Sequence, residues 1–158
     1  MPAVNSELID IRRFIAEQRA ERFRAFIVHG APLSGKSRFM REVAKREDGV
    51  YMDVLSLIHD DIALSQRVDT LDAAWLEGRV RAAIDEGATF VVVDDFDFLW
   101  PIWCDDIAPL LHRIERFYTP SPAVVTWVMP SHRVLDSVVI TRATGASRVL
   151  RLNEIAAL

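Results

Sequence analysis

The stretch of sequence that decides the fold reads Ala25-Phe26-Ile27-Val28-His29-Gly30-Ala31-Pro32-Leu33-Ser34-Gly35-Lys36-Ser37. Residues 25–28 have the length and apolar content of a buried strand. Residues 30–37 fit the pattern G-x-x-x-x-G-K-[ST] without a mismatch, and apolar residues recur at helical spacing from residue 37 onward. A strand, this loop and a helix in direct succession predict a unit of a parallel α/β sheet.

The residue types in this loop suit a polyphosphate. Gly30 and Gly35 let successive amide groups point into a nest of the size of an anion, and the start of the helix adds its positive dipole end. Lys36 would supply a cation for the β- and γ-phosphates, and the Ser37 hydroxyl would ligate Mg²⁺. We expect the nucleotide to contact Gly30, Ala31, Pro32, Leu33, Ser34, Gly35, Lys36, Ser37 and Arg38.

A second apolar run ends in acids. Residues 90–93 read Phe-Val-Val-Val, a continuous run typical of a strand covered on both faces, and Asp94 and Asp95 follow directly. Open α/β sheets bind ligands at the carboxyl ends of their strands, so both acids are expected beside the loop. We predict that Asp94 lies on the Mg²⁺ side, acting through water, and that Asp95 orients or deprotonates an attacking water.

Strand-like and helix-like segments alternate along the rest of the chain. This alternation predicts an α/β fold, with a parallel sheet of about five strands between two layers of helices. Residues 1–24 are expected to carry an N-terminal amphipathic helix, and residues 25–158 the core. Further helices are expected at residues 37–47, 71–86, 105–117 and 134–140, and further strands at 50–54, 124–129 and 148–152.

Composition narrows the class of protein. The 158 residues, 51% of them hydrophobic, have room for one domain with one core. The net charge of -4 provides no global basic field for holding nucleic acid. Cys104 is the only cysteine, so the chain has neither a disulfide of its own nor a cysteine cluster for zinc. Without a secretory start or an apolar run of about 20 residues, we expect a soluble, cytoplasmic protein that contacts no membrane.

The loop at 30–37, the acids at 94–95, the polar strand end at Ser131 and the short tail after Leu152 resemble the core of P-loop ATPases, specifically the AAA-like branch. The resemblance spans about residues 25–152. It implies a five-stranded sheet of order 5-1-4-3-2, Mg-ATP as the ligand, and function through self-association. We expect this protein to work without the helical lid that usually follows this core, because few residues follow the last predicted strand.

The resemblance also implies roles for Ser131 and for an arginine near the last strand. Ser131 would sense the γ-phosphate at the end of its strand, with a plain helix N-cap as the alternative. Arg142 would reach the nucleotide of a neighbouring subunit and stabilise transition-state charge, and Arg133 is the second choice. His29, directly before the loop, either touches the nucleotide or is a buried strand-end residue.

A lidless core of this size also resembles BrxF, the small P-loop protein of type III BREX phage-defence systems. The resemblance rests on chain length, the loop, the apolar strand before Asp94 and Asp95, and the missing lid. It implies a bacterial anti-phage role alongside other subunits, including a larger ATPase, with only indirect contact with DNA.

Three functions compete on this sequence. The leading hypothesis is an Mg-ATP-binding ATPase subunit of a multiprotein assembly. Asp95 is one methylene shorter than the glutamate that the family more often has there, which predicts slow or partner-dependent hydrolysis. A small-molecule or nucleotide kinase is the second hypothesis, although no compact arginine-rich lid appears between residues 105 and 131. The third is an adaptor that binds nucleotide without hydrolysing it.

Overall fold

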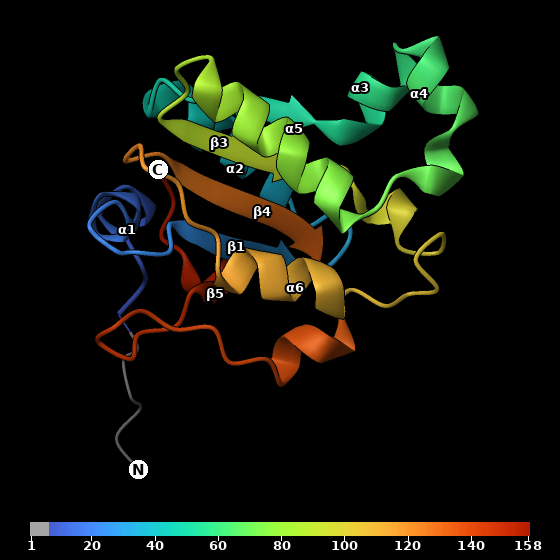
Figure 1. The fold of residues 1–158 in the computed structure, drawn as a ribbon. Helices are drawn as coiled ribbons and strands as arrows, with labels where there is room; N and C mark the ends of the chain where they lie inside the picture. The colour runs from blue at the N-terminus through green and yellow to red at the C-terminus, as the bar shows by residue number, and fades with distance from the viewer. Residues whose placement is uncertain (1–6) are drawn as a thin grey trace.

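Five parallel strands form one sheet in the computed structural model, which describes residues 7–158 (Figure 1). The strands are β1 (Ala25–Gly30), β2 (Val50–Asp53), β3 (Phe90–Asp94), β4 (Val124–Pro130) and β5 (Val149–Arg151). Their order across the sheet is β2-β3-β4-β1-β5, and every pairing is parallel. The predicted α/β class, the parallel sheet and the strand order 5-1-4-3-2 are confirmed.

In the described part of the chain, six α-helices accompany the sheet: α1 (Ile11–Gln18), α2 (Lys36–Arg46), α3 (Val54–His59), α4 (Ile62–Gln66), α5 (Ala73–Asp85) and α6 (Ala108–Glu115). Alternate residues of each strand feed two separate apolar clusters, as the period of a β-strand requires. One cluster joins the sheet to α5 and α6, and the other joins it to α1 and α2. Helices therefore cover both faces, which gives the three-layer arrangement expected from the alternation (Figure 1).

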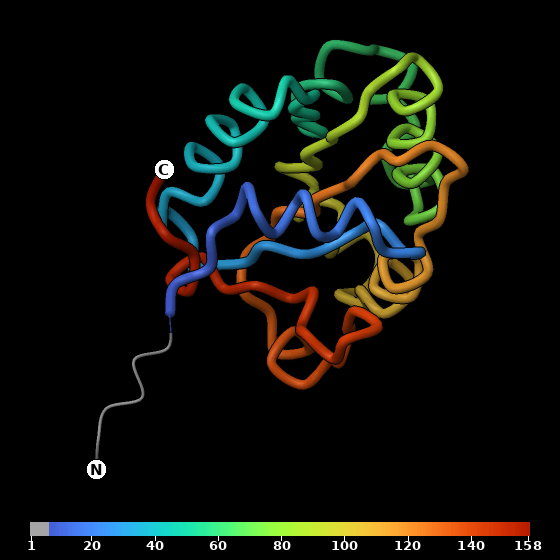
Figure 2. Tube along the Cα trace, turned by 90° about the vertical axis from the view of Figure 1, so that its left-hand side faces the viewer, coloured from blue at the N-terminus to red at the C-terminus, as the bar shows by residue number. Residues whose placement is uncertain are grey.

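The leading helix is part of one of these layers. Its N-cap is Asp10, whose carboxylate accepts from the Arg12 and Arg13 amides at 3.0 and 3.2 Å. The ring of Phe14 packs edge-on against Phe26 of β1, with centroids 4.9 Å apart. The segment before the helix lies beside the last residues of the chain, where Ile9 bridges Ile155 (Figure 2). Both ends of the described chain are thus held to the sheet.

The helices differ from the expectations in three places. Within residues 1–24, where the leading helix was expected, residues 1–6 lie outside the described part of the chain, and the helix covers only Ile11–Gln18. The expected helix at 134–140 is a short 3-10 turn, Arg133–Asp136, because the β-branched run that follows it disfavours helix. The short helices α3 and α4 were not predicted; Asp53 and Asp61 cap them. Within residues 7–158, no helix is both long enough and apolar enough to cross a bilayer.

Strand register brings the predicted site to one edge. Gly30 lies opposite Pro130, and Asp53 lies opposite Asp94. The carboxyl ends of β1, β2, β3 and β4 therefore meet at the same end of the sheet, where ligands of parallel α/β folds bind.

Candidate functional site

The two glycines of the loop between β1 and α2 differ in what they provide. A Cβ on Gly30 would lie 2.9 Å from Ser34 Oγ, so the exposed Ser34 side chain would have to shift to make room for it. Gly35 has φ +87°, in the left-handed region. Because Gly35 is also the N-cap of α2, no side chain caps that helix, and its first amides stay available to an anion.

Positive side chains gather at the same place. Lys36 Nζ donates to Ala31 O across the loop at 3.2 Å. The first turn of α2 contains no acid to offset this charge. Arg38 and Arg41 follow on the same helix and line the same cavity as Lys36. The loop thus combines mobile cations with the positive end of a helix dipole, as a phosphate site requires.

A cavity of about 540 Å³ joins this cationic loop to the acids that end β3. The acids Asp94, Asp95 and Asp97 line it together with the loop. The remaining lining residues are Pro32, Leu33, Gly35, Lys36, Ser37, Arg38, Arg41 and Pro130. The structure therefore brings together most of the predicted nucleotide residues and both predicted acids.

Asp94 is a buried carboxylate, 3% exposed, at the end of β3. Its Oδ1 accepts from the Asp95 amide at 2.7 Å, and its Oδ2 accepts from the hydroxyl of Tyr51 on β2. Among the described residues, Asp94 forms no ion pair. Neutral donors alone hold this carboxylate, so its charge remains to be balanced by a cation in the cavity.

Asp95 stands in a different environment. Its backbone has φ +55°, a left-handed conformation that is uncommon outside glycine. Burial, followed by the charges of Asp94 and Asp53, raises the pKa of Asp95 to about 6. A carboxylate with that pKa is ionised at neutral pH, yet it is a stronger base than an ordinary aspartate. These properties suit the predicted role of Asp95 as a base for water.

Three residues at this edge were missed by the sequence analysis. Arg41 lies with its guanidinium carbon 4.7 Å from the centroid of the Tyr51 ring, and Tyr51 in turn contacts Asp94. Asp53, at the end of β2, contributes to the raised pKa of Asp95. The rule that parallel strands end at one edge points to Asp53. No signal in the sequence predicts the contact between Tyr51 and Asp94.

The structure places Ser131 in a second cavity, of about 510 Å³, on the β5 side of the loop. Gly30, Ala31 and Ser34 from the predicted set also line that cavity. Ser131 Oγ lies 3.0 Å from Nδ1 of His29, a buried residue whose pKa is lowered by burial. The N-cap of the 3-10 turn is His132, which accepts from the Val134 amide, so the alternative cap role of Ser131 is wrong.

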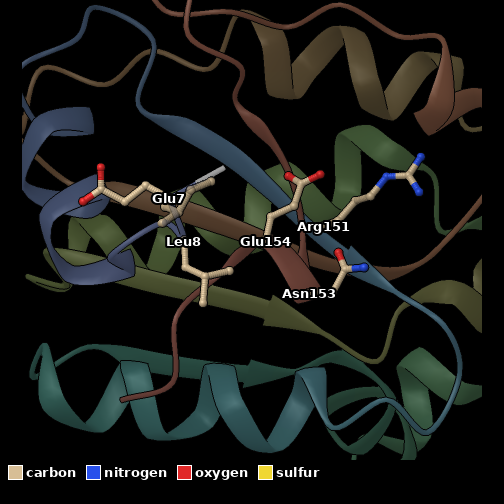
Figure 3. A pocket seen from close by; sticks show the side chains of 6 residues that line it. Glu7, Leu8, Arg151, Asn153 and Glu154 are labelled. Carbon is tan, nitrogen blue, oxygen red and sulfur yellow. The ribbon is translucent and has the colours of Figure 1, made fainter. Parts of the chain in front are cut away.

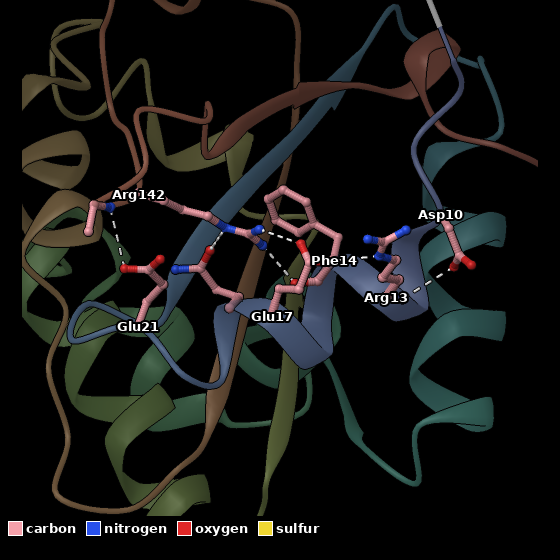
Figure 4. A network of polar contacts seen from close by, with 8 residues as sticks. Asp10, Arg13, Phe14, Glu17, Glu21 and Arg142 are labelled. Atoms are coloured by element: carbon pink, nitrogen blue, oxygen red, sulfur yellow. Dashed lines mark hydrogen bonds and ion pairs between the residues drawn. The ribbon is translucent and has the colours of Figure 1, made fainter.

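The guanidinium of Arg142 points toward α1 of its own chain (Figure 4). The residue is 8% exposed. Its Nε donates to Gln18 Oε1 at 2.7 Å, its Nη1 to Glu17 at 2.9 Å, and its Nη2 to Phe14 O at 2.7 Å. The predicted role of Arg142 at another subunit's nucleotide is therefore corrected: its donors are used within its own chain. Arg133, the second choice, is exposed.

One further cavity, of about 570 Å³, lies apart from the loop and the acids (Figure 3). Glu7 and Leu8 line it from the segment before α1, and Arg151, Asn153 and Glu154 line it from the end of β5 onward. It contains no residue of the predicted set. Within residues 7–158, no group of three or more His, Cys, Asp or Glu side chains is arranged to hold a metal ion.

Comparisons with known proteins leave the family open: no protein-family model matches the chain, and no curated protein matches it.

The groups that line the cavity fit a nucleotide with its magnesium ion. The cavity is lined by the cations of the loop and α2, by the Ser37 hydroxyl and by the carboxylates that follow β3. Phosphate oxygens bind such cations, and Mg²⁺ binds hydroxyl and carboxylate oxygens.

Proposed function

We propose that this protein is an Mg-ATP-binding ATPase subunit that works in an assembly with other protein subunits. One observation carries the proposal: a single cavity joins the uncapped start of α2 and Lys36 to Asp94 and Asp95. The two halves of that cavity have opposite charge, which suits a polyphosphate carried together with a divalent cation.

Each residue has a task that its position allows. The loop amides and Lys36 bind the phosphate oxygens and hold the terminal phosphate in place. Ser37 and Asp94 are the residues that would hold Mg²⁺, which when bound supplies positive charge against the charge on the leaving phosphate. Asp95 accepts the proton of the attacking water on its carboxylate, for which its raised pKa is suited.

A partner subunit completes the proposal. The side chain of Leu33 is wholly exposed at the tip of the loop, where a neighbouring protein would cover the phosphates. Arg142 is used internally, so a transition-state arginine would come from a partner or from Arg38, Arg41 or Arg133. A role in an anti-phage defence complex rests on the resemblance to BrxF alone.

The chain offers a matched pair of lysines for the test, because Lys36 and Lys45 are its only two and both lie on α2. Phosphate release from ATP is measured for the wild type, Lys36→Ala and Lys45→Ala, each with Mg²⁺ and with EDTA. We expect Mg²⁺-dependent release by the wild type and by Lys45→Ala, and at least about a hundredfold less by Lys36→Ala. Binding of ATP without release would favour the adaptor, and neither binding nor release would contradict the proposal.

A further inference from the structure

The hydroxyl of Tyr51 donates a hydrogen bond to Asp94 Oδ2 from the neighbouring strand. Tyr51 is paired with Val92 in the register between β2 and β3, so its Cα lies two residues back from the level of Asp94. A phenol is long enough to span that offset along the sheet surface. The contact therefore follows from the strand register and from the length of the tyrosine side chain.

Both oxygens of Asp94 have one neutral donor each. Oδ1 accepts from the amide of Asp95, and Oδ2 accepts from Tyr51. With one donor on each oxygen, rotation of the carboxylate about its last bond would break at least one of these bonds. A buried carboxylate that loses a donor is costly, so the pair fixes which lone pairs of Asp94 face the cavity.

Arg41 supports the ring of Tyr51 from the phosphate side. Its guanidinium carbon lies 4.7 Å from the ring centroid, within the range of a cation–π contact. Arg41 also lines the cavity of the loop and the acids. Arg41, Tyr51 and Asp94 thus contact one another in series, from the cations of α2 to the carboxylate that ends β3.

We propose that Tyr51 is a positioning residue for Mg²⁺ binding: its hydroxyl holds Asp94 in the orientation that receives the Mg²⁺ of the nucleotide, and Arg41 holds the ring of Tyr51 in place. The inference rests on the proposed function and adds a residue to it. Tyr51 acts only through Asp94; it touches neither the reacting phosphate nor the water. Its loss should therefore weaken the contribution of Mg²⁺ and leave the phosphate contacts of the loop intact.

The test compares Tyr51→Phe with Tyr118→Phe, which removes the hydroxyl of the chain's only other tyrosine, an exposed one. The affinity for a fluorescent ATP analogue is measured in EDTA and across a Mg²⁺ titration. For Tyr51→Phe we expect the affinity in EDTA to equal that of the wild type, and the Mg²⁺ concentration at half-effect to rise about tenfold. Tyr118→Phe should match the wild type in both, and Arg41→Gln should raise the half-effect concentration by a smaller factor.

Each result decides a separate question. A Tyr51→Phe variant with an unchanged Mg²⁺ titration overturns the role of Tyr51 while leaving the proposed function standing. A loss of affinity that is equal in EDTA and in Mg²⁺ also overturns it, because that pattern describes general damage to the site. A wild type that binds the analogue under neither condition overturns the proposed function, and this inference with it.

Discussion

Charged side chains meet at both ends of β1, and the two groups are built in opposite ways. At the amino end, Arg142 and Arg148 are buried, and each nitrogen of their guanidinium groups donates to an oxygen of the same chain. At the carboxyl end, Lys36 Nζ donates among residues 7–158 only to Ala31 O, and no described side chain caps the amides that begin α2. We call the amino end, where the arginines are paired within the chain, the closed end. We call the carboxyl end, where Lys36 and the first amides of α2 can bind a ligand, the open end.

The paired arginines of the closed end stabilise the fold, whereas the donors of the open end are placed to bind a ligand. The arginines at the amino end tie the segment from residue 141 to 148 to α1 and to the start of β1, and every nitrogen of their guanidinium groups has an acceptor in the same chain. At the carboxyl end, burial and then the charges of Asp94 and Asp53 raise the pKa of Asp95, so its ionised form is held at a cost to stability. Substitutions at the two ends should therefore have opposite signatures in measurements of folding and of nucleotide binding.

The largest effect is expected at the closed end. Arg148 donates to the carbonyls of Ala25, Thr141 and Glu115 at 2.7 to 3.1 Å. Arg148→Met would leave several of these buried acceptors without a donor, which we expect to lower the free energy of unfolding by about 4 kcal/mol. Chemical denaturation measures this, with exposed Arg116→Met as the control. A loss no larger than that of the control would mean that the amino end is not a stability element.

Substitution at the open end should change nucleotide binding and leave the stability of the free protein nearly unchanged. Lys36→Ala removes an incompletely buried cation, so the melting temperature without nucleotide should stay within about 2 °C of the wild type. Saturating Mg-ATP should stabilise the wild type by about 2 to 3 kcal/mol at a hundredfold excess over its Kd, and this gain should vanish in Lys36→Ala. Differential scanning fluorimetry with Lys45→Ala alongside checks both parts. A gain of equal size in Lys36→Ala would break the comparison.

The ionised carboxylate of Asp95 should destabilise the folded chain, and this effect should depend on pH. Its pKa is raised from an ordinary value of 3.8 to about 6, so the folded chain holds this proton more tightly than the unfolded chain does. The penalty for the charge is absent below pH 3.8, grows between pH 3.8 and 6, and is complete above pH 6. Asp95→Asn should therefore raise the melting temperature at pH 7.5 and leave it nearly unchanged at pH 4.

The same substitution should impair hydrolysis, because an amide cannot accept the proton of water. The wild-type rate should rise with pH through about 6, as Asp95 loses its proton. An Asp95→Asn variant that is no more stable than the wild type at pH 7.5, or that hydrolyses ATP as fast, would contradict the assignment.

The smallest effect is expected at the rim of the closed end. Glu17 is exposed, and hydrogen bonds from Arg13 and then Arg142 lower its pKa. A lowered pKa means that its contribution is present above the ordinary value of 4.5 and is lost as the pH falls through the folded value. Glu17→Gln should lower the melting temperature by about 1 to 2 °C at pH 7 and by less at pH 3. An equal drop at both pH values would rule out the ion pair as its cause.

The sequence was sufficient for the parts of the molecule that follow local rules. The loop pattern predicts a strand before Gly30 and a helix from Lys36, and the run before Asp94 predicts a buried strand; each is present. Because parallel strands end at one edge of the sheet, the sequence also allowed the prediction that Lys36, Asp94 and Asp95 lie close together, and they line one cavity.

The contacts that the sequence could not predict depend on side chains from distant segments. Arg142 has the same local setting whether it points to solvent or to Gln18, and only the packing of α1 decides between them. The bond between Tyr51 and Asp94 depends on the register of β2 and β3, which no motif records. The γ-phosphate role of Ser131 stays a prediction, whereas its contact with His29 depends on the pairing of β1 with β4, which the sequence does not give.

The most direct test of the central claim is calorimetric titration of the full chain with ATP in the presence of Mg²⁺, repeated with Lys36→Ala. The account predicts one ATP bound per chain, tighter binding with Mg²⁺ than with EDTA, and a loss of at least about a hundredfold in affinity in Lys36→Ala. Absence of binding by the wild type, or binding that Lys36→Ala leaves unchanged, would contradict it.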